Sequence, residues 1–88
     1  MREATLERRC GAFVRREGGW SLKLWPTVSG LPDRLVLMPV GRVYFVEFKT
    51  LTGRVSPIQK RVHGLLARLG FPVFVVRTFG QFTDMLDR

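Results

Sequence analysis

Residues 42–50 form the segment that most narrows what this chain can fold into. Side chains alternate along a strand, so the segment has two distinct faces. One face is wholly apolar and consists of Tyr44, Val46 and Phe48. The other face starts apolar and ends in two charges, with Val43, Phe45, Glu47 and Lys49. Apolar residues on both faces are typical of a central strand covered on both sides, which predicts a sheet with helices packed against it.

The chain on either side supplies the helices. Apolar residues at helical spacing predict a helix over residues 4–16, with Leu6, Cys10, Phe13 and Val14 on its buried face. Gly18 and Gly19 end this helix. A second helix follows Ser56, a favourable N-cap, with Pro57 at its first position and Gln59 as a capping-box partner. Its apolar stripe consists of Ile58, Val62, Leu65, Leu66 and Leu69. Residues 79–87 predict a short final helix.

Four segments are predicted as strands: 20–25, 33–38, 42–50 and 71–76. Pro39 and Gly41 make the connection between the second and third strands short, which favours an antiparallel hairpin. The order is therefore helix, three strands, helix, strand, helix. It predicts an α/β fold with a mixed sheet and helices against its faces.

The length and the net charge limit the number of domains and the kinds of partner that this chain can have. The 88 residues allow a single domain, residues 1–88, with a thin core. A net charge of +8 favours an anionic partner, with nucleic acid ahead of an acidic membrane surface. No apolar run approaches a membrane span or the core of a signal peptide. The single cysteine, Cys10, excludes an intrachain disulfide and fits a reducing cytosol.

Seven acidic residues stand against fifteen basic ones, so the positions of the acids are informative. Asp33 opens one strand of the predicted hairpin, which brings its carboxylate beside Glu47. Two converging carboxylates repel, and a divalent cation relieves that repulsion. Oxygen ligands favour Mg²⁺ or Mn²⁺ over zinc. The alternative is a structural pair of Glu47 with Lys49 at a strand end, and a strand-starting Asp33.

The first helix offers a further acid. On a helical wheel Glu3 falls inside the apolar stripe, whereas Glu7 lies on its edge. A carboxylate on a buried face needs a partner, and a metal ion would be one. The alternative is that Glu3 lies in a frayed, solvated first turn. Glu7 is then the other candidate.

Pro32-Asp33, followed after thirteen residues by Glu47-Phe48-Lys49, resembles the PD-(D/E)XK nuclease motif. Its surroundings are the Glu-containing first helix and a set of short motifs: Gly18-Gly19, Lys23, Gly30-Leu31-Pro32-Asp33-Arg34 and Ser56-Pro57-Ile58-Gln59. Together they resemble the VRR-Nuc branch, the virus-type replication-repair nucleases, in the short stand-alone form seen in phages and bacteria. The resemblance implies a restriction-endonuclease-like α-β-β-β-α-β core, with a mixed central sheet flanked by helices.

The resemblance also implies a metal site. Matched position by position, Asp33 and Glu47 would bind Mg²⁺ with the backbone carbonyl of Phe48, and Mn²⁺ would substitute. Glu3, or alternatively Glu7, matches the helical acid of the family. Whether one or two metal ions act stays open.

Two more residues match the family's site. Lys49 would position the attacking water or stabilise charge on the phosphate, and Gln59 matches the family's helix glutamine. Basic residues expected to face DNA are Lys23, Arg34, Arg42, Arg54, Lys60 and Arg61. His63 lies away from the centre of the apolar stripe of its helix, so we expect a surface residue and not a catalytic base.

The resemblance implies a Mg²⁺-dependent DNA endonuclease that works as a homodimer on branched DNA, above all four-way (Holliday) junctions, in the cytosol of a bacterial host. Large apolar residues exceed what a thin core hides, so Trp25 or Phe82 is expected to line a subunit interface. Two alternatives stay open. One is a non-catalytic nucleic-acid-binding module, and the other is a monomeric nuclease of flaps or nicks.

Overall fold

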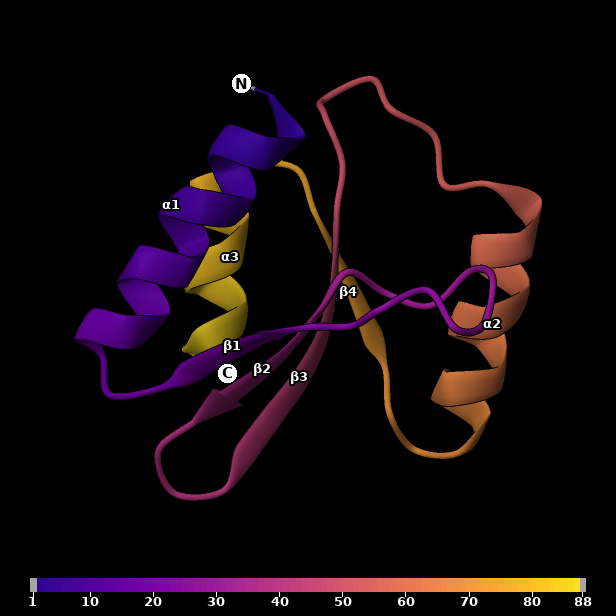
Figure 1. Cartoon of the computed structure of the whole chain (residues 1–88). Coiled ribbons are helices and arrows are strands. Elements are labelled where there is room, and N and C mark those ends of the chain that lie inside the picture. Colours follow the sequence, from indigo (N-terminus) through magenta and orange to yellow (C-terminus); the bar gives the residue numbers. More distant parts are fainter. Residues whose placement is uncertain (1, 88) are drawn as a thin grey trace.

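The computed structural model describes residues 2–87. The elements follow the order α1 (Glu3–Arg16), β1 (Trp20–Lys23), β2 (Arg34–Met38), β3 (Arg42–Phe48), α2 (Pro57–Arg68), β4 (Val73–Val76) and α3 (Phe79–Leu86). The sheet has the order β1-β2-β3-β4; the first three strands are antiparallel neighbours, and β4 is parallel to β3. In Figure 1 α1 and α3 lie on one face of this sheet and α2 on the other. The predicted α/β order and mixed sheet are confirmed.

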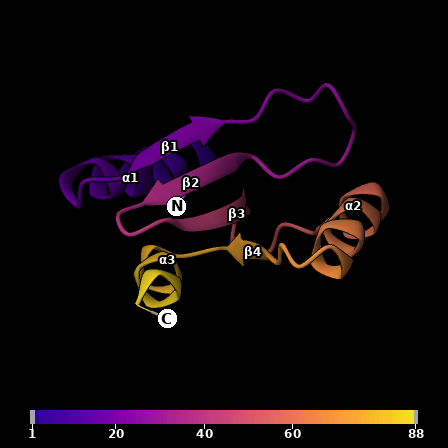
Figure 2. The same ribbon diagram turned by 90° about the horizontal axis from the view of Figure 1, so that it is seen from below.

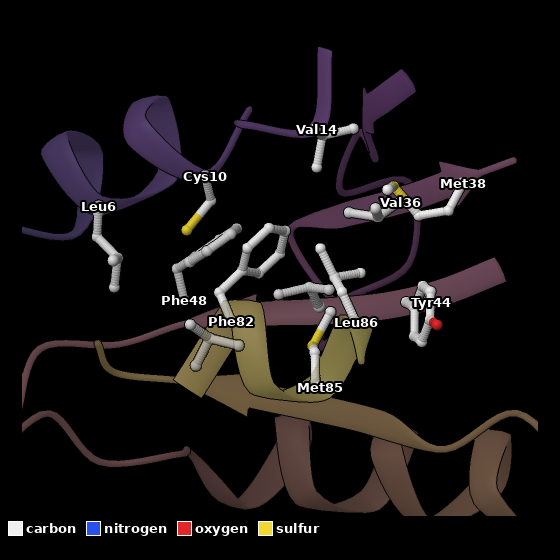
Figure 3. Close-up of a cluster of buried hydrophobic side chains, with 12 residues drawn as sticks. Leu6, Cys10, Val14, Val36, Met38, Tyr44, Phe48, Phe82, Met85 and Leu86 are labelled. Carbon is white, nitrogen blue, oxygen red and sulfur yellow. The ribbon is translucent and has the colours of Figure 1, made fainter. Parts of the chain in front are cut away.

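The core lies between the sheet and the pair α1 and α3 (Figure 3). Buried side chains from the two helices are Leu6, Cys10, Val14, Phe82, Met85 and Leu86. The strands contribute Val36, Met38, Tyr44, Val46, Phe48 and Val76. The Phe48 and Phe82 rings stand 6.2 Å apart at the centre. Phe82 is 0% exposed, so the prediction that it lines a subunit interface is wrong: it fills the core.

The opposite face of the sheet is thinly covered, because α2 packs mainly against β4 and leaves β1 and β2 open (Figure 2). No residue of α2 is buried, and Ile58, Leu65 and Leu69 are about half exposed or more. Val43 of β3 is also exposed. The prediction of a central strand covered on both sides therefore holds only for the end of β3 that carries Glu47.

Glycine permits the tight passage from α1 into the sheet. Gly18 has a φ of 83°, a left-handed conformation that side chains disfavour. A Cβ on Gly19 would lie 2.5 Å from the Leu37 carbonyl oxygen and 2.9 Å from a Val14 methyl group. The predicted glycine pair thus ends the helix and lets the chain turn directly into the edge strand β1.

Within residues 2–87, none of the helices has both the length and the apolar character needed to cross a membrane.

Candidate active site

Asp33 and Glu47 come together because of the register of the β2–β3 hairpin. Arg34 pairs with Val46, so Asp33 and Glu47 are the next opposing positions and share a face of the sheet. The Asp33 carbonyl accepts a hydrogen bond from Leu24 N at 2.9 Å, which extends the pairing toward β1. Asp33 Oδ2 accepts a second bond, from Phe48 N at 2.8 Å. This bond fixes the Asp33 side chain against the end of β3.

Glu47 is the one charged residue that lies in the interior of the described chain, with 2% of its surface exposed. Its Oε2 accepts a hydrogen bond from Gln59 Nε2 at 3.2 Å, and Lys49 Nζ lies 3.8 Å from the same oxygen. Among residues 2–87 its Oε1 has no hydrogen-bond partner. A buried carboxylate oxygen without a hydrogen-bond partner is costly, and the negative charge of the neighbouring Asp33 adds to that cost.

The pKa of Glu47 is raised from its ordinary value of 4.5 to about 7, and burial is the largest cause. The negative charges of Asp33 and Glu3 contribute to this rise, and the ammonium of Lys49 opposes it. The carboxyl therefore holds a proton near neutral pH when no cation is bound. A divalent cation that displaced this proton would relieve both the burial and the repulsion.

The residues at this site fit such an ion. Asp33, Glu47 and the Phe48 carbonyl are hard oxygen donors, which Mg²⁺ and Mn²⁺ prefer. In the part of the chain that the structure describes, no three side chains of His, Cys, Asp or Glu cluster as a complete metal site. The remaining ligands would be the backbone carbonyl and water, as is usual for Mg²⁺.

The start of α2 is anchored at the site by Gln59. Ser56 caps the helix by accepting a hydrogen bond from Gln59 N, and Gln59 Oε1 accepts one from Ser56 N at 2.9 Å. The predicted capping box is confirmed. Since the Gln59 amide nitrogen donates to Glu47, one side chain both caps the helix and holds the buried carboxylate. Gln59 thus lies at the site, as the sequence predicts.

His63 was also placed wrongly by the sequence reasoning. Its side chain is 13% exposed, and its Nε2 lies 3.7 Å from Glu47 Oε1, with no hydrogen-bond partner among the described residues. Burial lowers the pKa of His63, and the positive charge of Lys49 adds to this lowering while Asp33 opposes it, so the neutral ring is favoured. The available signal was its spacing: four residues after Gln59, it shares the helix face that points to Glu47.

The two helical acids have different surroundings. Glu7 Oε2 accepts a hydrogen bond from Arg34 Nε at 2.6 Å, and Lys23 Nζ lies 3.4 Å away. The Glu7 carboxylate is therefore held by two cations on β1 and β2. Glu3 is exposed at the start of α1 and lies near enough to raise the pKa of Glu47. Of the two candidates for the helical acid, the structure leaves Glu3 available.

The basic residues expected to face DNA fall into two groups. Lys23 and Arg34 share Glu7, whereas Arg54, Lys60 and Arg61 are exposed on the loop after β3 and on α2. Arg42 instead donates to the Leu86 carbonyl at 2.7 Å, at the hairpin end away from the site.

Sequence reasoning missed Arg77, which follows β4. Its NH1 group donates to the carbonyls of Thr50 and Gly53, both at 2.6 Å, and holds the loop that follows Lys49. These contacts span more than twenty residues and join side chain to backbone, so no local sequence signal marks them.

The order of elements, the mixed sheet, and an Asp33, Glu47 and Lys49 set at one end of the hairpin define a restriction-endonuclease-like domain of the PD-(D/E)XK type. Comparisons with known proteins agree. Residues 2–79 match the family model of the VRR-NUC domain. The chain is 39% identical over 77 residues to "Putative nuclease p44" of Acyrthosiphon pisum secondary endosymbiont phage 1. This match covers 86% of this chain and 83% of that protein.

A solved VRR_NUC domain structure superimposes with a TM-score of 0.87 at 32% sequence identity. The match covers 98% of this chain and 95% of that one. The chain therefore belongs to the VRR-NUC family of nuclease domains.

Proposed function

We propose that this nuclease is a Mg²⁺-dependent DNA endonuclease, with Mn²⁺ as a substitute, that cleaves branched DNA and above all four-way junctions as a homodimer. The observation that carries the proposal is the buried Glu47 carboxyl beside Asp33, whose Oε1 has no hydrogen-bond partner in residues 2–87. Two neighbouring carboxylates, one of them buried, beside a lysine form the arrangement expected of a phosphodiester-cleaving site.

Each residue has a defined task in this proposal. Asp33, Glu47 and the Phe48 carbonyl would hold the divalent ion, which would supply Lewis-acid activation of the scissile phosphodiester. Lys49 Nζ, next to the Glu47 carboxylate, stabilises the negative charge that develops on the phosphate. Gln59 keeps Glu47 oriented through its amide hydrogen bond. Glu3 is the acid of the first helix that completes the site.

The proposal of a homodimer rests on the open face of the sheet. The cross-strand register places Trp20, Leu37 and Val43 in one row on that face. Leu65 and Leu69 of α2 and Phe71 after it add exposed apolar surface. Trp25, 75% exposed, fits the predicted role at an interface. Large apolar patches on a small domain mark contact surfaces, and two-fold pairing would give one active site for each of two DNA strands.

A cleavage panel tests the activity. Labelled four-way junction, flap and linear duplex are incubated with the protein in Mg²⁺, Mn²⁺ or EDTA. We expect cleavage of the junction in both metals and none in EDTA. A preference for the flap would favour the monomeric alternative. Failure to cleave any substrate in either metal would favour a DNA-binding module without activity.

Sedimentation equilibrium tests the dimer at micromolar concentration. Leu65→Asp, on the exposed apolar face of α2, should convert the dimer to a monomer. The control is Val40→Asp, at the hairpin tip, where the side chain is 98% exposed and no packing is lost. A wild-type monomer, or a dimer that survives Leu65→Asp, contradicts the proposed interface.

A further inference from the structure

A basic groove lies between α1 and the edge strand β1. Its volume is about 510 Å³. Four cations line it, Arg8, Arg15, Lys23 and Arg34, against the single acid Glu7. The lining therefore carries an excess of positive charge that the chain's own acids do not neutralise.

The two arginines of α1 carry this excess. Lys23 and Arg34 are held by Glu7, but Arg8 and Arg15 make no ion pair or hydrogen bond with any side chain in the described residues. Both are exposed. They stand seven residues apart, two helical turns or about 10 Å, and so project from the same side of α1.

The residues of α1 between these arginines that line the groove have small side chains. Gly11 and Ala12 lie between Arg8 and Arg15 and line the groove. A Cβ added at Gly11 would meet nothing within 4 Å, so the space beside it is open. A chain of phosphates could therefore approach the helix backbone closely.

The inner end of the groove adjoins the candidate active site. The side chains of Arg34 and Lys23 face α1, on the side of the sheet opposite Asp33 and Glu47. The groove therefore reaches the site only around the end of the sheet, where Ala4 of α1, next to Glu3, lines it. The backbone contact of Leu24 N with the Asp33 carbonyl brings the end of β1 beside the metal-binding carboxylate. A strand that enters the site can thus continue along α1, which lies above β1 in Figure 1.

We propose that this groove binds the sugar–phosphate backbone of one strand of a DNA duplex arm next to the cleaved phosphodiester. The inference rests on the proposed function and adds where the arm lies. Along a duplex one strand places a phosphate every ~3.4 Å of axis, so the Arg8–Arg15 span matches about three nucleotides. The contacts are to phosphates, which positions the arm without reading its sequence.

The test measures binding and needs no cleavage. Fluorescence anisotropy in EDTA gives the affinity of the protein for a labelled linear duplex at several KCl concentrations. In the variant Arg8→Gln/Arg15→Gln the slope of log affinity against log salt should fall in magnitude by about 1.8, since each lost phosphate contact contributes about 0.9. The control Arg16→Gln/Arg68→Gln removes the same charge elsewhere and should leave the slope close to that of the wild type.

A second pair of variants guards against a folding defect. Ala12→Glu places a carboxylate in the groove and should weaken binding at least tenfold, whereas Ala67→Glu, an equally exposed helical alanine on α2, should not. Equal slopes and affinities in groove and control variants would overturn the proposal. If the groove variants weaken binding but the wild type cleaves no DNA, the proposed function would be overturned, whereas the proposal that the groove binds DNA would be supported.

Discussion

Replacing Glu47 with Gln should stabilise the protein when no divalent ion is present. Glu47 is buried, and its carboxyl has a pKa of about 7 in the folded chain against an ordinary 4.5. Gln has nearly the same shape and no charge. It can still accept the hydrogen bond from Gln59 Nε2 that Glu47 accepts. The substitution therefore removes the buried ionisation and keeps the packing.

The pKa of Glu47 sets the magnitude and the pH window. Because the folded carboxyl keeps its proton up to about pH 7 while the unfolded one loses it near 4.5, folding takes up a proton between these values. The stability that Glu47 contributes is fully present below pH 4.5 and is lost as the pH rises toward 7. The difference in pKa corresponds to about 3 kcal/mol.

Urea unfolding in EDTA at pH 5 and pH 8 measures this effect. The wild type and Glu47→Gln should be much closer in stability at pH 5, whereas at pH 8 the variant should gain about 3 kcal/mol relative to the wild type. Adding Mg²⁺ at pH 8 should stabilise the wild type and leave the variant unchanged. A difference between the two proteins that does not depend on pH would show that the Glu47 carboxyl does not titrate between pH 5 and pH 8.

Three further effects are expected in urea unfolding. Gly19→Ala should lower the free energy of unfolding by about 1–3 kcal/mol, because the added Cβ would clash with the Leu37 carbonyl. The control Gly11→Ala, where the space is open, should raise it by about 0.5–1 kcal/mol. Equal effects of the two substitutions would contradict the close approach of Gly19 to Leu37. Ser56→Ala removes the N-cap of α2 and should lower the free energy of unfolding by about 1 kcal/mol. An unchanged urea midpoint would argue against the capping box. Val40→Asn should raise the free energy of unfolding by about 1 kcal/mol, because Val40 has a φ of 67°, a left-handed conformation that Asn adopts more easily than Val. A lower free energy of unfolding would contradict that turn conformation.

The sequence predicted the features of the site that depend on local rules. Strand alternation and a short hairpin were enough to place Asp33 beside Glu47. Helix capping was enough to place Gln59 at the start of α2, and that position also carries the amide to Glu47. These predictions succeed because register and capping are properties of a few neighbouring residues.

The features that were missed depend on contacts between distant segments. His63 was expected at the surface, because its position on the helical wheel says nothing about which strand α2 faces. The Arg34 contact with Glu7 joins residues 27 apart, and it occupies the acid that had been an alternative metal ligand. The apolar stripe of α2 was expected to be buried, yet the helix lies beside β4 and leaves much of the stripe exposed.

We propose that Asp33, Glu47 and Lys49 form a metal-dependent site that cleaves DNA. Single-turnover cleavage of a labelled four-way junction in Mg²⁺ tests it most directly, with wild type, Asp33→Asn and Lys49→Ala compared at equal DNA saturation. Both variants should fold, bind the junction and cleave it at least ~10²-fold more slowly, and EDTA should abolish wild-type cleavage. Cleavage at the wild-type rate by either variant, or by the wild type in EDTA, would contradict the account.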